Sequence, residues 1–309
     1  MRGLQNTMFL GTGTALVTPF AESGVDFASM GRMIDWQIAE GIDFLVVLGT
    51  TGEAPVISDD ERQKIIAFAV ARAAGRVPVV VGTGGNNTDH AIRNCAEAHR
   101  LGASGALVVT PYYNKPSQEG LYRHFRAVAE MTEIPVILYN VPGRTGVNMQ
   151  PATVARLAEI PNVVALKEAC GDLGQVDETI ALLRRVCPDF LVLSGNDDQT
   201  FHIVNSGGHG AISVLSNVAP ARAAQMVRAC LGGDVATARD IHHLTLPLVR
   251  SLFAETSPMP VKYAVSRLGF CENRVRLPLV EASEATMRRI DADMLAIGAL
   301  PAFEEPRSA

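Results

Sequence analysis

Short runs rich in valine, isoleucine and leucine recur roughly every 30 residues along this chain, and an amphipathic, alanine-rich segment follows each of them. The eight runs are Thr14–Val17, Phe44–Leu48, Val77–Val81, Ala106–Val109, Val136–Leu138, Val163–Leu166, Phe190–Leu193 and Ala211–Val214. Alternation of a buried strand with a helix is typical of a parallel sheet that helices cover. The pattern therefore predicts an α/β protein.

Eight strand–helix units within about 230 residues fit a closed (β/α)8 TIM barrel. A doubly wound open sheet is the alternative, and it requires a glycine-rich phosphate turn after its first strand. The nearest candidate, Gly82-Thr83-Gly84-Gly85, follows the third run and lacks the third spaced glycine. We therefore predict that residues 1–232 form the barrel.

The alternation stops after the eighth unit. Three segments that read as helices follow, and no low-complexity linker precedes them. These segments are Asp234–Phe253, Pro260–Leu268 and Glu281–Leu295. We predict that residues 233–309 form a C-terminal helical extension that packs on the barrel.

The composition limits the partners. The chain has 309 residues and a formal net charge of −5, so no basic face is indicated and nucleic acid is not an expected partner. Its five cysteines are scattered and never form a Cys-x-x-Cys pair, which suits a reducing cytoplasm and argues against a disulfide framework or a zinc site. No apolar run is long enough to span a bilayer. We expect a cytoplasmic protein that does not enter membranes.

The run Val163–Leu166 ends directly in Lys167. Lysine is rarely buried without a partner, and burial lowers its pKa, which yields a free amine near neutral pH. A free amine attacks ketones and forms a Schiff base. The ordinary alternative is a lysine that leaves the strand end and pairs with a nearby carboxylate.

Side-chain alternation relates this lysine to a tyrosine. Ile137 and Tyr139 share one face of their strand, and Ala165 and Lys167 share one face of the next. Consecutive strands are neighbours in a barrel, so the Tyr139 hydroxyl and the Lys167 amine meet at its mouth if both faces point inward. A phenol in that place can shuttle protons during imine formation. The alternative for Tyr139 is an aromatic cap on the core.

Two other strand ends offer groups for anions. The Gly49-Thr50-Thr51-Gly52 stretch provides hydroxyls and backbone N–H groups near an expected helix start, which suits a small carboxylate. Arg144 lies in a Pro-Gly-Arg-Thr-Gly loop, where its forked donors suit a second carboxylate. An ordinary capped turn and a solvated loop arginine are the alternatives. The strand ends hold no histidine and no facing carboxylate pair, so metal-assisted chemistry is not expected.

These stretches resemble the dihydrodipicolinate synthase / N-acetylneuraminate lyase family. The motifs stand in the family's order over nearly the whole chain: Gly49-Thr50-Thr51-Gly52-Glu53, Pro111-Tyr112-Tyr113, Tyr139-Asn140-Val141-Pro142-Gly143-Arg144-Thr145-Gly146 and Leu166-Lys167-Glu168. The resemblance implies a class I, Schiff-base aldolase on a (β/α)8 barrel that needs no metal or organic cofactor. Within the family, Arg144 resembles the dihydrodipicolinate synthase branch, because the sugar-acid lyases usually lack this arginine.

The resemblance also implies a reaction and its catalytic residues. Pyruvate and L-aspartate 4-semialdehyde would condense to 4-hydroxy-tetrahydrodipicolinate, in lysine and diaminopimelate biosynthesis. Lys167 would form the imine with pyruvate. Tyr139, Thr50 and Tyr113 would form a proton relay, with Tyr113 offered across a subunit interface of a homotetramer built from tight dimers.

Four residues would bind the substrates by the same resemblance. Thr51 would hold the pyruvate carboxylate, and the backbone at Ile212 would line that pocket. Arg144 would bind the carboxylate of the semialdehyde, with Gly195 nearby.

The resemblance is incomplete at the cleft where some family members bind lysine as an inhibitor. Asn86 and Tyr112 match that cleft. His90 replaces an acid that would hold the ammonium of lysine, and histidine cannot do so as well. Ala54, Asp59 and Arg62 also depart from the pattern. These departures put feedback inhibition by lysine in question.

Two other functions compete with this interpretation. A relative could use the same imine step with a different aldehyde, as in a sugar-acid lyase or a hydratase-aldolase, and Arg144 is the residue that discriminates. A barrel retained only for binding or as a scaffold is the other. It predicts a broken set of site residues, whereas each matching position here holds a chemically competent residue type.

Overall fold

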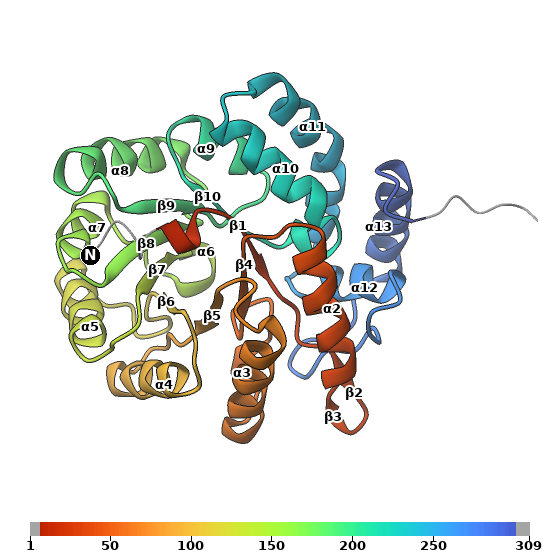
Figure 1. Cartoon of the computed structure of the whole chain (residues 1–309), viewed down its shortest axis with the longest axis horizontal. Coiled ribbons are helices and arrows are strands. Elements are labelled where there is room, and N and C mark those ends of the chain that lie inside the picture. Colours follow the sequence, from red (N-terminus) through yellow and green to blue (C-terminus); the bar gives the residue numbers. More distant parts are fainter. Residues whose placement is uncertain (1–6, 301–309) are drawn as a thin grey trace, which may run out of the picture.

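The structure is a computed structural model, and it describes residues 7–300 of the chain. Its centre is a closed barrel of parallel strands in the order β1-β10-β9-β8-β7-β6-β5-β4, ringed by helices (Figure 1). The strands are β1 Gly11–Ala15, β4 Phe44–Val47, β5 Val79–Gly82, β6 Gly105–Val109, β7 Val136–Asn140, β8 Val163–Glu168, β9 Leu191–Ser194 and β10 Gly210–Ser213. The predicted (β/α)8 barrel is confirmed.

The first strand differs from its predicted range. It begins at Gly11, three residues earlier than the apolar run, and consists of small residues. The reason is the neighbouring ring of Phe44, because a Cβ at Gly13 would lie 2.1 Å from Phe44 Cε2. Gly13 therefore leaves room for the Phe44 ring, and this part of the strand is not marked by hydrophobicity.

Helices follow the strands, mostly at the predicted positions. They are α2 Phe27–Ala39, α3 Asp59–Ala73, α4 Thr88–Arg100, α5 Gln118–Glu130, α6 Pro142–Thr145, α7 Pro151–Ala158, α8 Leu173–Val186, α9 Thr200–Asn205 and α10 Pro220–Leu231. The 3-10 helices are η1 Thr7–Phe9, η2 Ala54–Val56 and η3 Leu215–Asn217, and a hairpin joins β2 Phe20–Ala21 to β3 Gly24–Val25. A capping box of Ser58 and Glu61 fixes the start of α3.

Three helices continue the chain after α10. They are α11 Val235–Leu252, α12 Met259–Arg267 and α13 Glu284–Ala296. They contact one another, α11 packs on α10, and all lie on one side of the barrel near α2 and α10 (Figure 1). Helix α11 contains Pro247 in its interior. Residues 1–6 and 301–309 of the two predicted parts lie outside the described residues.

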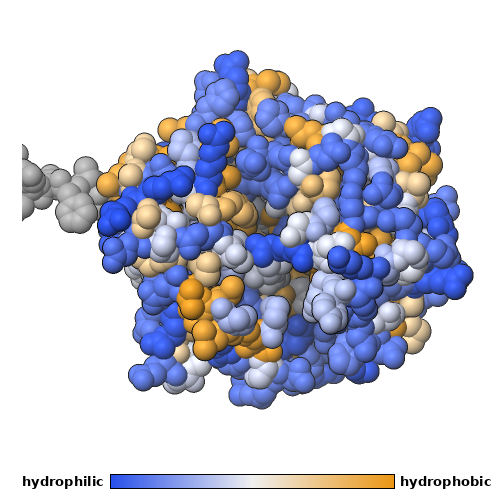
Figure 2. All heavy atoms as spheres, turned by 180° about the vertical axis from the view of Figure 1, so that it is seen from behind, coloured by the Kyte–Doolittle hydropathy of each residue, from blue (hydrophilic) through white to orange (hydrophobic). Residues whose placement is uncertain are grey.

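The strands bury their two faces in different clusters. Alternate side chains point into the barrel, as Ile137 and Tyr139 do from β7, and Phe9 of η1 packs against Phe44 in the same inner cluster. The intervening side chains, such as Leu138 and Leu166, pack outward against the helices. Hydrophilic residues cover most of the face opposite to that of Figure 1, and hydrophobic residues form a few separate patches there (Figure 2). None of the helices within residues 7–300 is both long and apolar enough to span a bilayer.

Candidate active site

Lys167 and Tyr139 stand opposite each other at the ends of β8 and β7. Both side chains are buried, and the Lys167 Nζ lies 4.2 Å from the centre of the Tyr139 ring. Lys167 makes no ion pair or hydrogen bond with any residue of the described chain, so the alternative of a carboxylate partner at the strand end does not hold. The structure thus places an amine and a phenol together inside the barrel.

A β-bulge in β8 decides this placement. Val136 pairs with Val163, but the next residue of β7, Ile137, pairs with Ala165, so Val164 is an extra residue. With regular pairing, Tyr139 would face Leu166, and Lys167 would point out among the helices. The extra residue turns the lysine to the interior.

Gly195 makes room for the side chain of Lys167. A Cβ at this position would lie 3.1 Å from Lys167 Cε and 2.9 Å from the Cβ of Ala169. The Gly195 N–H also donates to the carbonyl of Glu168 at 2.7 Å, which fixes the approach. Gly195 therefore lies against the stem of the lysine, where a larger residue would displace the amine.

Two buried carboxyl groups surround this strand end without pairing with the lysine. Burial raises the pKa of Glu168 to about 7, against hydrogen bonds from the Asn140 side chain and the Cys170 backbone. Burial also raises the pKa of Asp197, and the two backbone N–H groups that donate to its carboxylate oppose that rise. Neither group makes an ion pair within 4.0 Å of the amine.

The loop after β4 carries Thr50 and Thr51, and their hydroxyls make no hydrogen bond to the described chain. Thr50 also lines the cavity described below, whereas Thr51 is 5% exposed and does not line it. The short helix η2 follows them, and α3 begins at Asp59, where the helix start was predicted. The loop is closed by a turn in which the Gly52 N–H donates to Gly49 at 3.1 Å.

Arg144 lies in the four-residue helix α6, at the rim of the barrel mouth. Its side chain is exposed, and Nη2 donates to the carbonyl of Ser257 at 3.2 Å. Ser257 belongs to the connection between α11 and α12, so the C-terminal helices orient this arginine.

A cavity of about 410 Å³ opens at this mouth. Thr50, Tyr139 and Arg144 all contribute to its wall. The positions tied to lysine inhibition lie partly in the same cavity, which Ala54, Asp59, Arg62 and Tyr112 also line. Arg62 is held there by its hydrogen bond to the Gly82 carbonyl, at 2.8 Å.

Two predicted residues differ in accessibility. Ile212 of β10 is fully buried in the inner cluster that contains Tyr139. Tyr113 is 88% exposed with a φ of 71°, and it does not line the cavity at the mouth of its own barrel. Sequence reasoning gave no role to Glu53, Lys262 or Ser257. A lysine on the buried face of an amphipathic helix was the one signal that could have found Lys262.

Comparison with known proteins assigns the chain. The model of the Dihydrodipicolinate synthetase family matches residues 8–297. The chain belongs to this family.

A 4-hydroxy-tetrahydrodipicolinate synthase of Kosmotoga olearia is 52% identical over 95% of this chain and 100% of its own length. One of Thermotoga petrophila is 48% identical over 91% and 96%. The crystal structure of the Thermotoga maritima dihydrodipicolinate synthase has a TM-score of 0.94 at 46% identity, and it covers 95% of this chain and 100% of its own. The predicted resemblance to the dihydrodipicolinate synthase family is thus confirmed.

Proposed function

We propose that this chain is a lyase that condenses pyruvate with L-aspartate 4-semialdehyde to 4-hydroxy-tetrahydrodipicolinate, in lysine and diaminopimelate biosynthesis. Membership of the family and the names of its relatives at about half identity support the reaction. The observation that carries it is the Lys167 amine, which is buried without a carboxylate partner and lies 4.2 Å from the Tyr139 ring.

The chemistry begins at Lys167. The amine adds to the ketone of pyruvate and expels water, and the resulting iminium draws electrons from the methyl group. A methyl proton then leaves, and the enamine carbon attacks the aldehyde of the second substrate. The amine of that substrate displaces Lys167 from the imine carbon, which closes the ring and frees the enzyme. Tyr139 and Thr50, with Tyr113, move the protons.

In this proposal the carboxylates of the two substrates have separate binding sites. Thr51 holds the carboxylate of pyruvate, and the backbone at Ile212 lines the same pocket. Arg144 binds the carboxylate of the semialdehyde at the rim, and Gly195 keeps the lysine arm in place. No metal or organic cofactor takes part, because the lysine itself serves as the electron sink.

We propose that the protein works as a homotetramer in the cytoplasm. The 88% exposure of Tyr113 supports this, because an exposed phenol is free to enter the site of a second copy. Size-exclusion chromatography with light scattering gives the mass. Mixing Tyr113→Phe chains with Lys167→Met chains should restore activity if the two residues act across subunits.

Borohydride reduction in the presence of pyruvate tests the imine step. We expect a single adduct at Lys167, located by peptide mass spectrometry. Absence of the adduct at this lysine would remove the mechanism.

Arg144→Ala tests the second substrate. We expect the KM for aspartate semialdehyde to rise more than about tenfold while the imine with pyruvate still forms. Arg123→Ala, which changes an exposed arginine of α5 paired with Glu119, is the matched control. Unchanged semialdehyde kinetics in Arg144→Ala would favour the alternative of a pyruvate-dependent aldolase with another aldehyde.

A further inference from the structure

Lys262 of α12 and Glu53 of the loop after β4 form an ion pair in the interior of the protein. Their Nζ and Oε1 atoms are 2.8 Å apart, and neither side chain has exposed surface. The ammonium also donates to the backbone carbonyl of Thr18 at 2.5 Å and to that of Arg274 at 3.1 Å. Three oxygen atoms therefore replace water around a fully buried charge.

The C-terminal extension holds Glu53 from two sides. Its Oε2 accepts the backbone N–H of Arg276 at 3.0 Å, and its Oε1 has the Lys262 ammonium as its partner. The backbone of Glu53 is left-handed, with φ 56° and ψ 36°, a conformation that a residue with a Cβ adopts only when its surroundings impose it. The conformation of this residue thus depends on contacts from a distant part of the chain.

The same contacts reach the two threonines of the candidate site. The Glu53 N–H donates to the carbonyl of Thr50 at 3.1 Å. The hydroxyl of Thr18 donates to the carbonyl of Gly52 at 2.7 Å, and Lys262 binds the carbonyl of Thr18. The lysine is therefore connected to the segment that carries Thr51 through Thr18 and through Glu53.

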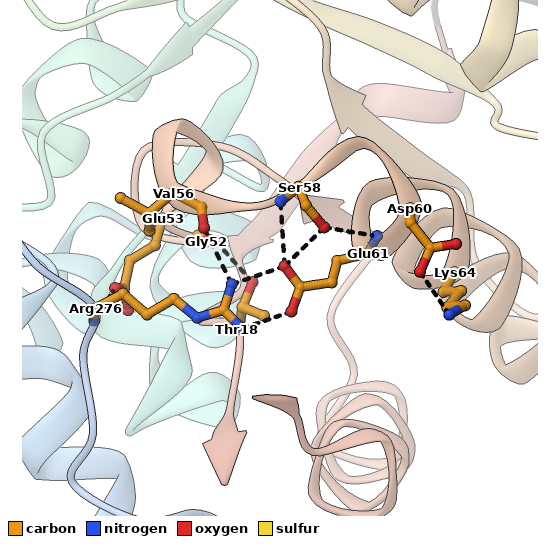
Figure 3. Close-up of polar contacts among 9 residues, drawn as sticks. All are labelled: Thr18, Gly52, Glu53, Val56, Ser58, Asp60, Glu61, Lys64 and Arg276. Atoms are coloured by element: carbon orange, nitrogen blue, oxygen red, sulfur yellow. Dashed lines mark hydrogen bonds and ion pairs between the residues drawn. The ribbon is translucent and has the colours of Figure 1, made fainter. Parts of the chain in front are cut away.

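A second contact from the extension closes the outside of the loop. The Arg276 guanidinium donates to the carbonyl of Val56 at 3.0 Å and binds both carboxylate oxygens of Glu61 (Figure 3). The Arg276 guanidinium, together with Ser58, lowers the pKa of Glu61 to about 2. This outer contact is partly exposed, whereas the inner pair is shielded from water and salt.

We propose that Glu53 and Lys262 are positioning residues, which hold the Thr50 and Thr51 hydroxyls in register with the Lys167 amine for the carboxylate of pyruvate. The inference rests on the proposed function of those threonines. It assigns to α12 a part in substrate binding, although none of its residues lines the cavity at the barrel mouth.

The character of the pair favours positioning over simple stability. A buried ion pair gives little net stabilisation, because desolvation of both charges offsets their attraction, and apolar side chains of the same volume serve stability as well. An ammonium that donates to two backbone carbonyls and lies 2.8 Å from a carboxylate instead defines direction. A different part of the extension contacts Arg144, because the Ser257 carbonyl that accepts from it lies in the connection between α11 and α12.

The test compares Michaelis constants for the two substrates in Glu53→Gln and Lys262→Met. We expect the KM for pyruvate to rise about tenfold while the KM for aspartate semialdehyde changes less than about twofold. Ser251→Ala is the matched control, because it removes a partly buried hydrogen bond to Asp293 between α11 and α13 and touches no part of the loop. It should lower Tm and leave both Michaelis constants unchanged.

Thr18→Val covers the outcome in which the charge variants do not fold. It removes the hydrogen bond to Gly52 without burying an unpaired charge, and we expect the KM for pyruvate to rise about threefold. A lower Tm with an unchanged KM for pyruvate in the folded variants would show a merely structural role and overturn the inference.

Thr51→Val separates failure of this inference from failure of the function. If Thr51→Val raises the KM for pyruvate and Glu53→Gln does not, only the positioning role is wrong. If Thr51→Val leaves that KM unchanged, the assignment of Thr51 to the carboxylate of pyruvate is wrong. Absence of a borohydride adduct at Lys167 in the wild-type protein would remove the reaction.

Discussion

Lys167 and Lys262 are both buried, but only Lys262 has a carboxylate partner for its ammonium group. Lys262 has a carboxylate at 2.8 Å and two carbonyl groups, so its ammonium is fully compensated. Lys167 has an aromatic ring at 4.2 Å and no ion pair within the described chain. Burial lowers the pKa of Lys262, and the Glu53 carboxylate opposes that effect.

The difference separates a lysine that holds structure from one that is free to react. An amine must lose its proton to attack a ketone, and a close anion would keep the proton on it. The carboxyl groups next to Lys167 are instead hydrogen-bonded to backbone or amide donors and have raised pKa values. The same residue type therefore serves two purposes, according to which oxygen atoms surround it.

Lys167→Met is expected to give the largest effect. Without the amine no imine forms, and kcat should fall by about 10⁴-fold or more, whereas the fold is kept because no ion pair is broken. A coupled assay and thermal unfolding measure the two quantities. Lys64→Met, at an exposed lysine of α3, is the control. Substantial residual activity in Lys167→Met would contradict the proposal that Lys167, unlike Lys262, is the reactive lysine.

Lys262→Met should produce the reverse result. It leaves Glu53 buried without a partner, so the free energy of unfolding should fall by about 3–5 kcal/mol. At saturating pyruvate the borohydride adduct at Lys167 should still form. Urea unfolding measures the loss, and a change below about 1 kcal/mol would contradict the description of this pair.

The pH dependence of stability reports whether Glu168, which follows Lys167 in β8, is ionised in the folded protein. Its pKa is about 7 in the folded protein against an ordinary 4.5, so the folded state retains a proton that the unfolded state releases. The stability from this group is present below about pH 4.5 and is lost as pH rises to about 7, on the order of 3 kcal/mol in total. The free energy of unfolding of the wild type should therefore fall relative to that of Glu168→Gln as the pH rises through this range. A constant difference between them would show that Glu168 stays ionised.

Arg276→Gln should have the smallest effect. It removes the outer contact to Glu61 and keeps the backbone N–H that binds Glu53. The free energy of unfolding should therefore fall by only about 1 kcal/mol. Because this pair is partly exposed, the difference should shrink at high salt. The Lys262→Met loss should not change with salt, and equal salt dependence of the two would mean that the inner pair is solvated.

Much of the fold and of the candidate site could be predicted from the chain alone. The period of the apolar runs identified every barrel strand, although β1 begins earlier than its run and includes Gly13, where a side chain would meet Phe44. Strand-end polarity predicted Thr50 and Arg144 as site residues, and both line the cavity. It also suggested the Lys167–Tyr139 pair, which needed the extra residue in β8 to come about.

The sequence by itself determined the architecture and the inventory of reactive groups, because hydrophobic period and turn chemistry are local properties of the chain. Only the tertiary structure decided which way Lys167 points, since a one-residue slip in strand pairing reverses every side chain after it. It alone joined Glu53 to Lys262 and Arg144 to Ser257. Such contacts link residues far apart in the chain, and they depend on the packing of whole helices, which leaves no mark in a short stretch of sequence.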